Sequence, residues 1–227
     1  LAVPDLGSHR SPLPNIVWWG AAMFLVIGSS IATALYVRRA PVEQVTTRLS
    51  VQPPANAVIS SDSAPVISPD GRTLAFVARD SSGRAQLWVR PLDSLTAHPL
   101  TGTEDARQPF WSPDSRFLGF FVQGRLKKIE MSGGPPQTIG DTSSTLTDRA
   151  TWGADGLILI GSTGVSPLQS IPAVGGGQLK PATVLDALRQ ERSHNFPYFL
   201  PDGRHFLYLA LSAKTENNGV YVGSTDS

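Results

Sequence analysis

The sequence has no cysteine, and its charges almost cancel. A chain without cysteine forms no disulfide, binds no structural zinc through thiolates and offers no thiol nucleophile. Nineteen Lys and Arg residues against 18 Asp and Glu residues give a formal net charge of +1, which supplies no field of the kind that attracts nucleic acid. The one tight basic cluster, Arg125 to Lys128, is interpreted as the solvated face of a strand. We therefore expect no nucleic-acid partner.

Signatures of several enzyme classes are also absent from the sequence. It has no Gly-x-Ser-x-Gly elbow of a serine hydrolase, and neither the His-Arg-Asp nor the Asp-Phe-Gly motif of a protein kinase. The glycines at 175–177 lack a following Lys-(Ser/Thr), so they predict a hairpin turn rather than a phosphate-binding loop. His194 is interpreted as a hydrogen-bonded structural residue, because we find no second histidine or carboxylate to complete a metal site or a triad. We expect no catalytic residue, cofactor or metal in this chain.

One long uncharged and apolar run lies near the start of the chain, at residues 16–37. As a helix it would be about 33 Å long, which matches a hydrocarbon core of about 30 Å. Aromatic and basic residues of the kind that favour membrane interfaces mark its two ends: Trp18, Trp19, Tyr36, Arg38 and Arg39. The run predicts a single transmembrane helix after a juxtamembrane segment at 1–15, with the lipid bilayer as a partner.

The sequence leaves the orientation and the association of this helix open. Arg38, Arg39 and Arg48 follow the run and Arg10 precedes it. That difference would place the C-terminal side in the cytoplasm, although large domains are translocated largely regardless of such charges. Small residues four positions apart, at 28 and 32 and at 30 and 34, would let two helices approach closely, so dimerisation through the helix is a hypothesis.

A linker and a first strand at 38–56 precede a motif that occurs four times, at intervals of about 40 to 50 residues. Each copy is a turn around an aspartate: Pro69-Asp70-Gly71, Pro113-Asp114-Ser115, Asp155-Gly156 and Pro201-Asp202-Gly203. Proline sets φ at the first corner of such a turn, aspartate bonds its own backbone two residues on, and glycine accepts a positive φ. We interpret these residues as structural.

Apolar residues alternate after the turns, as in Leu74 and Phe76, and this predicts strands. Units of this length with several strands and no helical periodicity are typical of the blades of a β-propeller. The units span about 57–104, 105–146, 147–192 and 193–227. We therefore predict an all-β fold, a partial propeller of about four blades at 57–227, preceded by the transmembrane helix.

These turns resemble the TolB-type propeller family, whose blades carry a Ser-Pro-Asp-Gly-(Arg/Lys) core followed by alternating apolar residues. Ser68 to Phe76 fit this core throughout, and Ser112 to Phe120 fit it with Ser115 and Gly119 as departures. The resemblance covers about residues 45–227 and implies a ring of roughly six to eight blades. We expect the remaining blades downstream, and interpret both ends of the sequence as cuts in a longer protein.

A more particular resemblance is to the sensor region of bacterial receptor-type serine/threonine kinases, in which a cytoplasmic kinase domain precedes one membrane helix and such a propeller. The linker, the strand at 47–52 with Pro53-Pro54, and the segment from Ser193 to Arg204 carry this resemblance. It implies a single-pass protein of the bacterial inner membrane with its propeller outside the cytoplasm. The kinase domain would precede Leu1.

The first functional hypothesis is therefore a sensor region that binds a protein or a small ligand on the propeller face. The alternative is a membrane-tethered propeller of a winged-helix regulator, or a non-enzymatic envelope scaffold. A propeller that caps a peptidase is a third hypothesis, and it requires a serine hydrolase domain after the missing blades. The sequence upstream of Leu1 separates the first two, because only the kinase carries a glycine-rich loop and a His-Arg-Asp motif.

Overall fold

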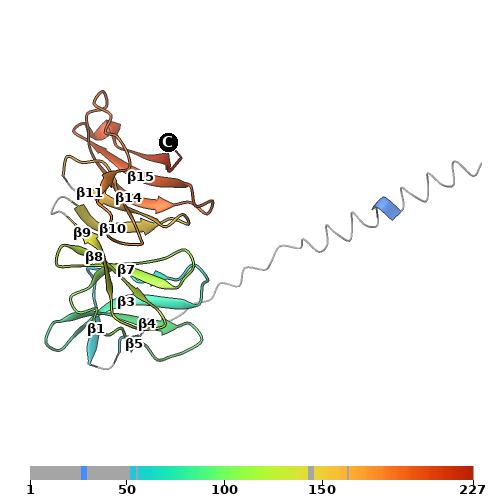
Figure 1. Ribbon diagram of the computed structural model, residues 1–227, viewed down its shortest axis with the longest axis vertical. Coiled ribbons are helices and arrows are strands. Elements are labelled where there is room, and N and C mark those ends of the chain that lie inside the picture. Colours follow the sequence, from blue (N-terminus) through green and yellow to red (C-terminus); the bar gives the residue numbers. More distant parts are fainter. Residues whose placement is uncertain (1–26, 30–51, 55, 143–145, 163, 227) are drawn as a thin grey trace, which may run out of the picture. The chain divides into compact units, whose positions relative to one another are not determined.

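The computed structural model describes residues 27–29, 52–54, 56–142, 146–162 and 164–226 (Figure 1). The chain divides into two units, Leu1–Ser50 and Val51–Ser227. All the strands of the described residues lie in the second unit.

The predicted fold class included a transmembrane helix, and this part of the prediction was wrong. A spanning helix needs about 20 apolar residues, and none of the helices in the described parts of the chain is long and apolar enough to cross a membrane. Of the predicted span 16–37, only the helical turn at 27–29 is described. The fold class is therefore all-β. The predicted interface residues lie outside the described residues: Trp18, Trp19, Tyr36, Arg38 and Arg39.

Within the described residues, four antiparallel sheets follow one another along the chain, and we call them blades 1 to 4. Blade 1 contains β1 (Ala57–Ile59), β2 (Val66–Ile67), β3 (Thr73–Asp80), β4 (Ala85–Pro91) and β5 (His98–Pro99). Blade 2 contains β6 (Arg107–Trp111), β7 (Phe117–Val122), β8 (Arg125–Glu130) and β9 (Gln137–Asp141). Blade 3 contains β10 (Leu146–Trp152), β11 (Leu157–Ser162), β12 (Gln169–Pro172) and β13 (Lys180–Pro181). Blade 4 contains β14 (Glu191–Phe199), β15 (His205–Ser212) and, after the short helix η1 (Thr215–Asn217), β16 (Gly219–Ser224).

Blades 2 to 4 pair their strands in chain order, so that their strands are joined by short connections. In blade 1 the first position is shared by β1 and β2, which both pair with β3. These sheets confirm the all-β propeller part of the predicted fold.

The turns between the first and second strands are held by their own side chains. In blade 1, Ser68 Oγ donates to Asp70 Oδ1 at 2.5 Å, and the same carboxylate oxygen accepts the N–H of Arg72 at 3.0 Å. Ser68 Oγ in turn accepts the N–H of Thr73 at 2.9 Å. The serine and aspartate of the family core therefore replace backbone hydrogen bonds that the tight turn leaves unmade.

Ser115, the departure from the Pro-Asp-Gly pattern, connects two blades. It lies in the left-handed region with φ 60°, where a residue other than glycine is strained. Its Oγ accepts the N–H of Asp70 in the preceding turn at 3.1 Å. A glycine here would relieve the strain but lose this bond between blade 1 and blade 2.

Acid is expected to weaken the last of these turns. Hydrogen bonds from the backbone N–H groups of His205 and Arg204, with the His205 side chain, lower the pKa of Asp202 from 3.8 to about 2. Because the folded-state pKa lies below the unfolded value, the stabilisation is complete above about pH 4 and is lost as the pH falls through 2. Urea unfolding midpoints of the wild type should therefore fall more steeply between about pH 4 and pH 2 than those of Asp202→Asn. Parallel pH profiles for the two proteins would contradict the assignment.

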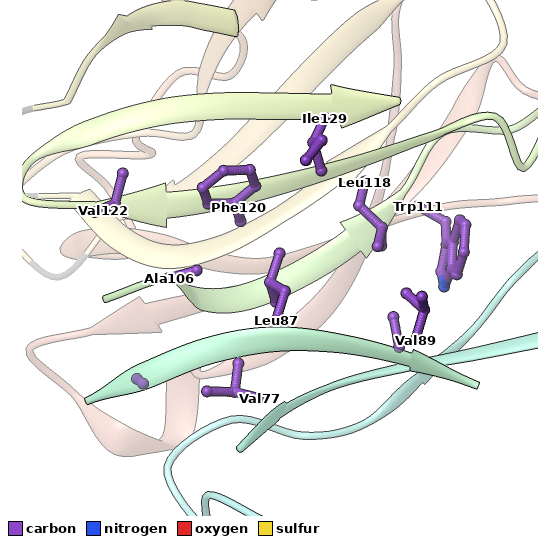
Figure 2. Packing of buried hydrophobic residues seen from close by; sticks show 11 residues of the cluster. Val77, Leu87, Val89, Ala106, Trp111, Leu118, Phe120, Val122 and Ile129 are labelled. Carbon is purple, nitrogen blue, oxygen red and sulfur yellow. The ribbon is translucent and has the colours of Figure 1, made fainter. Parts of the chain in front are cut away.

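The core lies between neighbouring blades, because each blade is apolar on both faces. Val77 of β3 and Leu87 of β4 pack against Leu118 and Phe120 of β7, and Trp111 closes the cluster (Figure 2). The alternate residues of β7 point the other way, since successive side chains of a strand face opposite sides of the sheet. The second strands of blades 2 and 3, β7 and β11, therefore each contribute to two interfaces.

The next two interfaces follow the same alternation. Phe121 of β7 packs against Ile158 and Ile160 of β11. Leu159, between those two isoleucines, packs against Phe206 of β15. The stack of blades is therefore continuous from blade 1 to blade 4.

Candidate functional site

Two adjoining hollows lie along the first strands of the four blades. The larger, of about 520 Å³, is lined by residues of β2, β6, β10 and β14 and of the turns that follow these strands. The smaller, of about 360 Å³, shares five of its lining residues with the larger: Val66, Pro109, Ala150, Pro197 and Tyr198. We call the two hollows together the inner groove. Because every blade contributes one strand, the groove exists only when the blades are stacked.

The structure brings some of the predicted turn residues to this groove. Pro69, Pro113, Pro201 and Gly203 line its larger hollow. The aspartates stay apart, because each accepts a hydrogen bond from the backbone of its own turn, as Asp155 Oδ1 does from Leu157 N at 3.0 Å. Among the residues that the structure describes, no three His, Cys, Asp or Glu side chains are grouped to hold a metal ion.

The wall of the larger hollow is apolar and rich in aromatic rings. Trp111, Trp152, Tyr198 and Phe199 all contribute to it. The indole N–H of Trp111 is donated to the Val66 carbonyl oxygen at 3.2 Å, so it is not available to a ligand. The prolines of the wall have no backbone N–H to offer. Such a wall favours an extended, largely apolar ligand.

Two lining residues, Gln108 and Phe196, have an unusual backbone. Their φ angles are 48° and 51°, and each precedes a proline, which restricts its backbone further. Both lie where the pairing of the first strand with the second shifts register, in β6 and in β14. Strain of this kind is concentrated at ligand sites, where it turns a side chain in a direction that a regular strand does not allow.

Arg149 of β10 lies beside Phe196 in the smaller hollow. Its guanidinium carbon is 4.6 Å from the centroid of the Phe196 ring, the geometry of a cation–π contact. Both side chains are exposed, Phe196 by 49%. A cation thus lies at one end of a groove whose other described lining residues carry no charge.

Sequence reasoning did not single out Gln108, Arg149 or Phe196 as site residues. A signal existed for two of them, because Gln108-Pro109 and Phe196-Pro197 occupy the same place in their repeats, five residues before the aspartate of the turn. Arg149 has no such signal, since Ala150 replaces the proline in the third unit.

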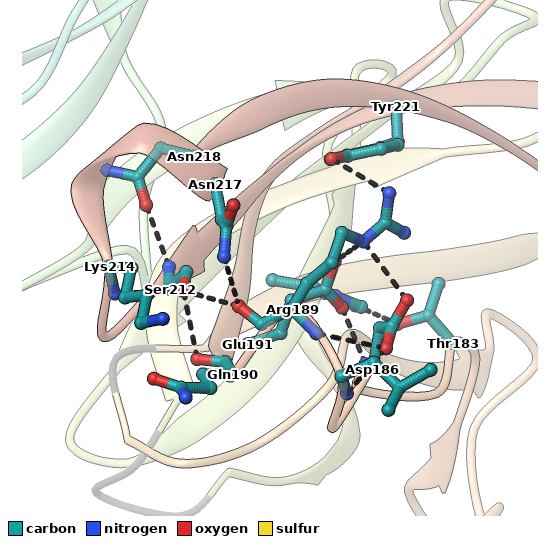
Figure 3. Close-up of polar contacts among 12 residues, drawn as sticks. Thr183, Asp186, Arg189, Gln190, Glu191, Ser212, Lys214, Asn217, Asn218 and Tyr221 are labelled. Carbon is teal, nitrogen blue, oxygen red and sulfur yellow. Dashed lines mark hydrogen bonds and ion pairs between the residues drawn. The ribbon is translucent and has the colours of Figure 1, made fainter.

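A second polar cluster lies in blade 4, around Glu191 and Arg189 (Figure 3), and it includes His194. His194 Nδ1 is 2.7 Å from Thr183 Oγ1, and Nε2 is 3.0 Å from Glu191 Oε2. The expectation that no carboxylate accompanies His194 was therefore wrong, because Glu191, three residues earlier, folds back onto the ring. The order of hydroxyl, imidazole and carboxylate resembles a catalytic triad in composition.

The surroundings of this cluster make it structural. His194 has 0% of its surface exposed, so no substrate atom reaches its ring. The Thr183 hydroxyl already accepts the N–H of Leu168 at 3.0 Å. Burial, with the negative charge of Glu191, also raises the pKa of the neighbouring Tyr208. We infer that the cluster stabilises blade 4.

The cluster also fixes the loop before β14. Glu191 Oε2 accepts the N–H of Asp186 at 2.7 Å, and Arg189 Nε lies 3.1 Å from Asp186 Oδ2 and 3.3 Å from Glu191 Oε1. Arg189 also donates to the Tyr221 hydroxyl at 3.1 Å (Figure 3). The loop is thereby joined to β16 at the edge of the blade.

Comparison with known proteins identifies the class of fold. The structure is similar to a putative TolB from Agrobacterium tumefaciens, with a TM-score of 0.56 and 18% identity over 70% of this chain and 60% of that one. TolB from Acinetobacter baumannii gives a TM-score of 0.53 and 19% identity over 72% of this chain and 40% of that one. The β-propeller domain of the trilobed protease from Pyrococcus furiosus gives 0.51 and 19%, over 76% and 56%. The chain therefore has a TolB-type β-propeller fold.

Among curated proteins, the chain is similar to the uncharacterized peptidase YuxL of Bacillus subtilis (strain 168). The two are 27% identical over 159 residues, which are 66% of this chain and 22% of YuxL. No protein-family model matches the chain. The chain thus spans about a fifth of the curated relative and no more than 60% of the TolB and protease structures compared with it.

Proposed function

We propose that this chain is a recognition domain that binds an extended segment of a polypeptide in the inner groove. The observation that carries the proposal is the groove itself, an aromatic and apolar wall assembled from the first strands of all four blades. Hollows of about 300 to 1,000 Å³ are typical of ligand sites, and aromatic grooves suit extended, proline-containing segments. Among the described lining residues, no side chains form a nucleophile–base pair, and the role that we propose is one of binding.

Two larger proteins are candidate hosts for such a domain. The resemblance of the sequence to receptor-type serine/threonine kinases supports a ligand-binding sensor region, with the kinase encoded upstream. The similarity to YuxL supports the propeller of a peptidase, in which the groove would bind a peptide before cleavage. A glycine-rich loop and a His-Arg-Asp motif before residue 1 would establish the first host, and a Gly-x-Ser-x-Gly elbow after residue 227 the second.

Replacing Tyr198 with serine is expected to weaken peptide binding about tenfold or more, which is about 1.4 kcal/mol. Tyr198 lines both hollows and its side chain is 64% exposed, so it offers contact area to a ligand and little to the core. The free energy of unfolding should change by less than about 0.5 kcal/mol. The probe is a linear peptide selected from a random library that is displayed on phage with free C-termini, and its binding is measured by fluorescence anisotropy.

The matched control is Val174→Ser, at a residue that is 86% exposed and does not line the groove. It removes a comparable exposed apolar side chain and should leave peptide affinity unchanged. A library that yields no peptide for the folded wild-type protein, or a peptide that binds the Tyr198→Ser variant as tightly as the wild type, would refute the groove as the binding site.

A further inference from the structure

We infer that the inner groove binds the C-terminal end of a polypeptide, with the terminal carboxylate held by the guanidinium group of Arg149. The inference rests on the proposed function and adds to it the chemical end of the ligand and its direction in the groove. Four features of the described residues support it: the sign of the charge in the groove, the partner of Arg149, the supply of hydrogen-bond donors, and the position of Arg149 along the groove.

The first feature is charge. Among the described residues that line the two hollows, Arg149 is the one charged residue, and no Asp or Glu accompanies it. The ammonium group of a peptide N-terminus would therefore leave water for a wall without a carboxylate, which is unfavourable. A terminal carboxylate meets a guanidinium group, which can form two parallel hydrogen bonds with it.

The second feature is the partner of Arg149. Several other arginines of the domain lie in ion pairs, as Arg79 does with Asp62 at 3.1 Å and Arg116 with Glu130 at 3.2 Å. Arg149 instead lies over the ring of Phe196. A guanidinium group held over an aromatic ring keeps N–H groups that can donate to a ligand. In the described part of the domain, the neighbour of this cation is therefore an aromatic ring rather than a carboxylate.

The third feature is the scarcity of other donors. Pro109 and Pro197 line both hollows and lack a backbone N–H. The side-chain amide of Gln108 donates to the Asp62 carbonyl oxygen at 2.6 Å. The hydroxyl of Tyr198 is a further side-chain donor in both hollows, but Arg149 is the one charged donor among the described lining residues, so we expect the carboxylate at Arg149 and the ligand in one direction.

The fourth feature is position. Arg149 lines only the smaller hollow, whereas Trp152 and the turn prolines line only the larger one. With the carboxylate in the smaller hollow, the preceding residues of the peptide extend past Tyr198, which lines both, into the aromatic wall. Apolar or proline residues upstream of the C-terminus are the chemistry that this wall accepts.

The test compares one selected peptide in three forms: with a free C-terminus, with a C-terminal amide, and as an amide that carries an internal glutamate. Amidation is expected to weaken binding to the wild type at least tenfold, because it removes the charge that Arg149 recognises. Arg149→Gln should weaken binding of the free acid by a similar factor and should leave the affinity for the amide almost unchanged. Arg149→Lys should retain part of the affinity for the free acid, since it keeps the charge without the planar geometry.

Arg192→Gln is the matched control, because Arg192 is an exposed arginine of the neighbouring strand β14 that does not line the groove. Tight binding of the amide to the wild type, with Tyr198→Ser still weakening it, would overturn this inference and leave the proposed function intact. Equal binding of the free acid and of the amide with the internal glutamate would also overturn it, because Arg149 would then bind a side-chain carboxylate as well as a terminal one. Loss of all peptide binding would refute the proposed function itself.

Discussion

His194→Ala is expected to lower the free energy of unfolding by about 3 kcal/mol, one of the two largest losses that we expect from a single substitution in this chain. The substitution removes a fully buried ring and leaves the Thr183 hydroxyl with the N–H of Leu168 as its remaining partner. It also leaves one oxygen of Glu191, whose side chain is 3% exposed, with the Asp186 N–H as its remaining hydrogen bond. A buried charge that loses a partner is strongly destabilising. Urea unfolding monitored by far-ultraviolet circular dichroism measures the effect.

His98→Ala is the control, because His98 is exposed and lies on the two-residue strand β5. It should change the free energy of unfolding by less than about 0.5 kcal/mol. Peptide binding offers a second comparison, since His194 does not line the inner groove. If His194→Ala unfolds at the same urea concentration as the wild type, the cluster is not a determinant of stability in blade 4.

The repeat made much of the fold predictable from the sequence. The hydrogen-bonding side chains of the Ser-x-Asp turn have a fixed spacing in the sequence, so the turn of blade 1 could be recognised from its residues alone. The alternation of Leu118 and Phe120 with Phe121 gives the two faces of β7, because side chains alternate across a strand. These are local rules, and they hold whatever lies elsewhere in the protein.

The groove and the buried cluster could not be predicted in the same way. Ala106 and His194 both lie three residues before the proline of their strands, yet the chain reaches them from Thr103 and Thr183 by connections of very different length. Thr103 and Thr183 have the same role, each accepting a backbone N–H from the preceding blade at 3.1 and 3.0 Å. Only the connection from Thr183 to His194 is long enough to contain a residue, Glu191, whose carboxylate folds back onto the histidine. The path of this connection depends on tertiary contacts.

Arg149 illustrates a second limit of sequence reasoning. The sequence shows it only as a basic residue within a strand, for which a solvated position is the usual expectation. Its position in the groove depends on Phe196, which lies in the next blade and whose backbone is left-handed. Contacts between blades of this kind follow from the stacking of whole sheets, and no local pattern encodes them. The membrane partner and the inner-membrane location rest on residues outside the described part of the chain and stay predictions.

The second large loss is expected from Gly119→Ala, about 2 to 3 kcal/mol of the free energy of unfolding. Gly119 of β7 pairs with Phe110 of β6, and a Cβ at this position would lie 2.3 Å from Cζ of the Phe110 ring. Phe110 is itself 7% exposed and packed in the cluster between blades 2 and 3, so the ring cannot move away without disturbing its neighbours. In blade 1 the corresponding pair is Val66 with Ala75, where a smaller residue on the first strand permits a larger one on the second.

If the clash between a Cβ at position 119 and the Phe110 ring causes the loss, a smaller residue at position 110 should reduce it. Phe110→Leu should relieve the clash, so the double variant Gly119→Ala/Phe110→Leu should be more stable than the sum of the two single effects predicts, by about 1 kcal/mol or more. Gly219→Ala on the edge strand β16 is the control, because its added Cβ would come no closer than 3.1 Å to an atom of Tyr221. It should cost less than Gly119→Ala. Strictly additive effects of the two substitutions in the pair would show that Gly119 is required for some reason other than the Phe110 ring.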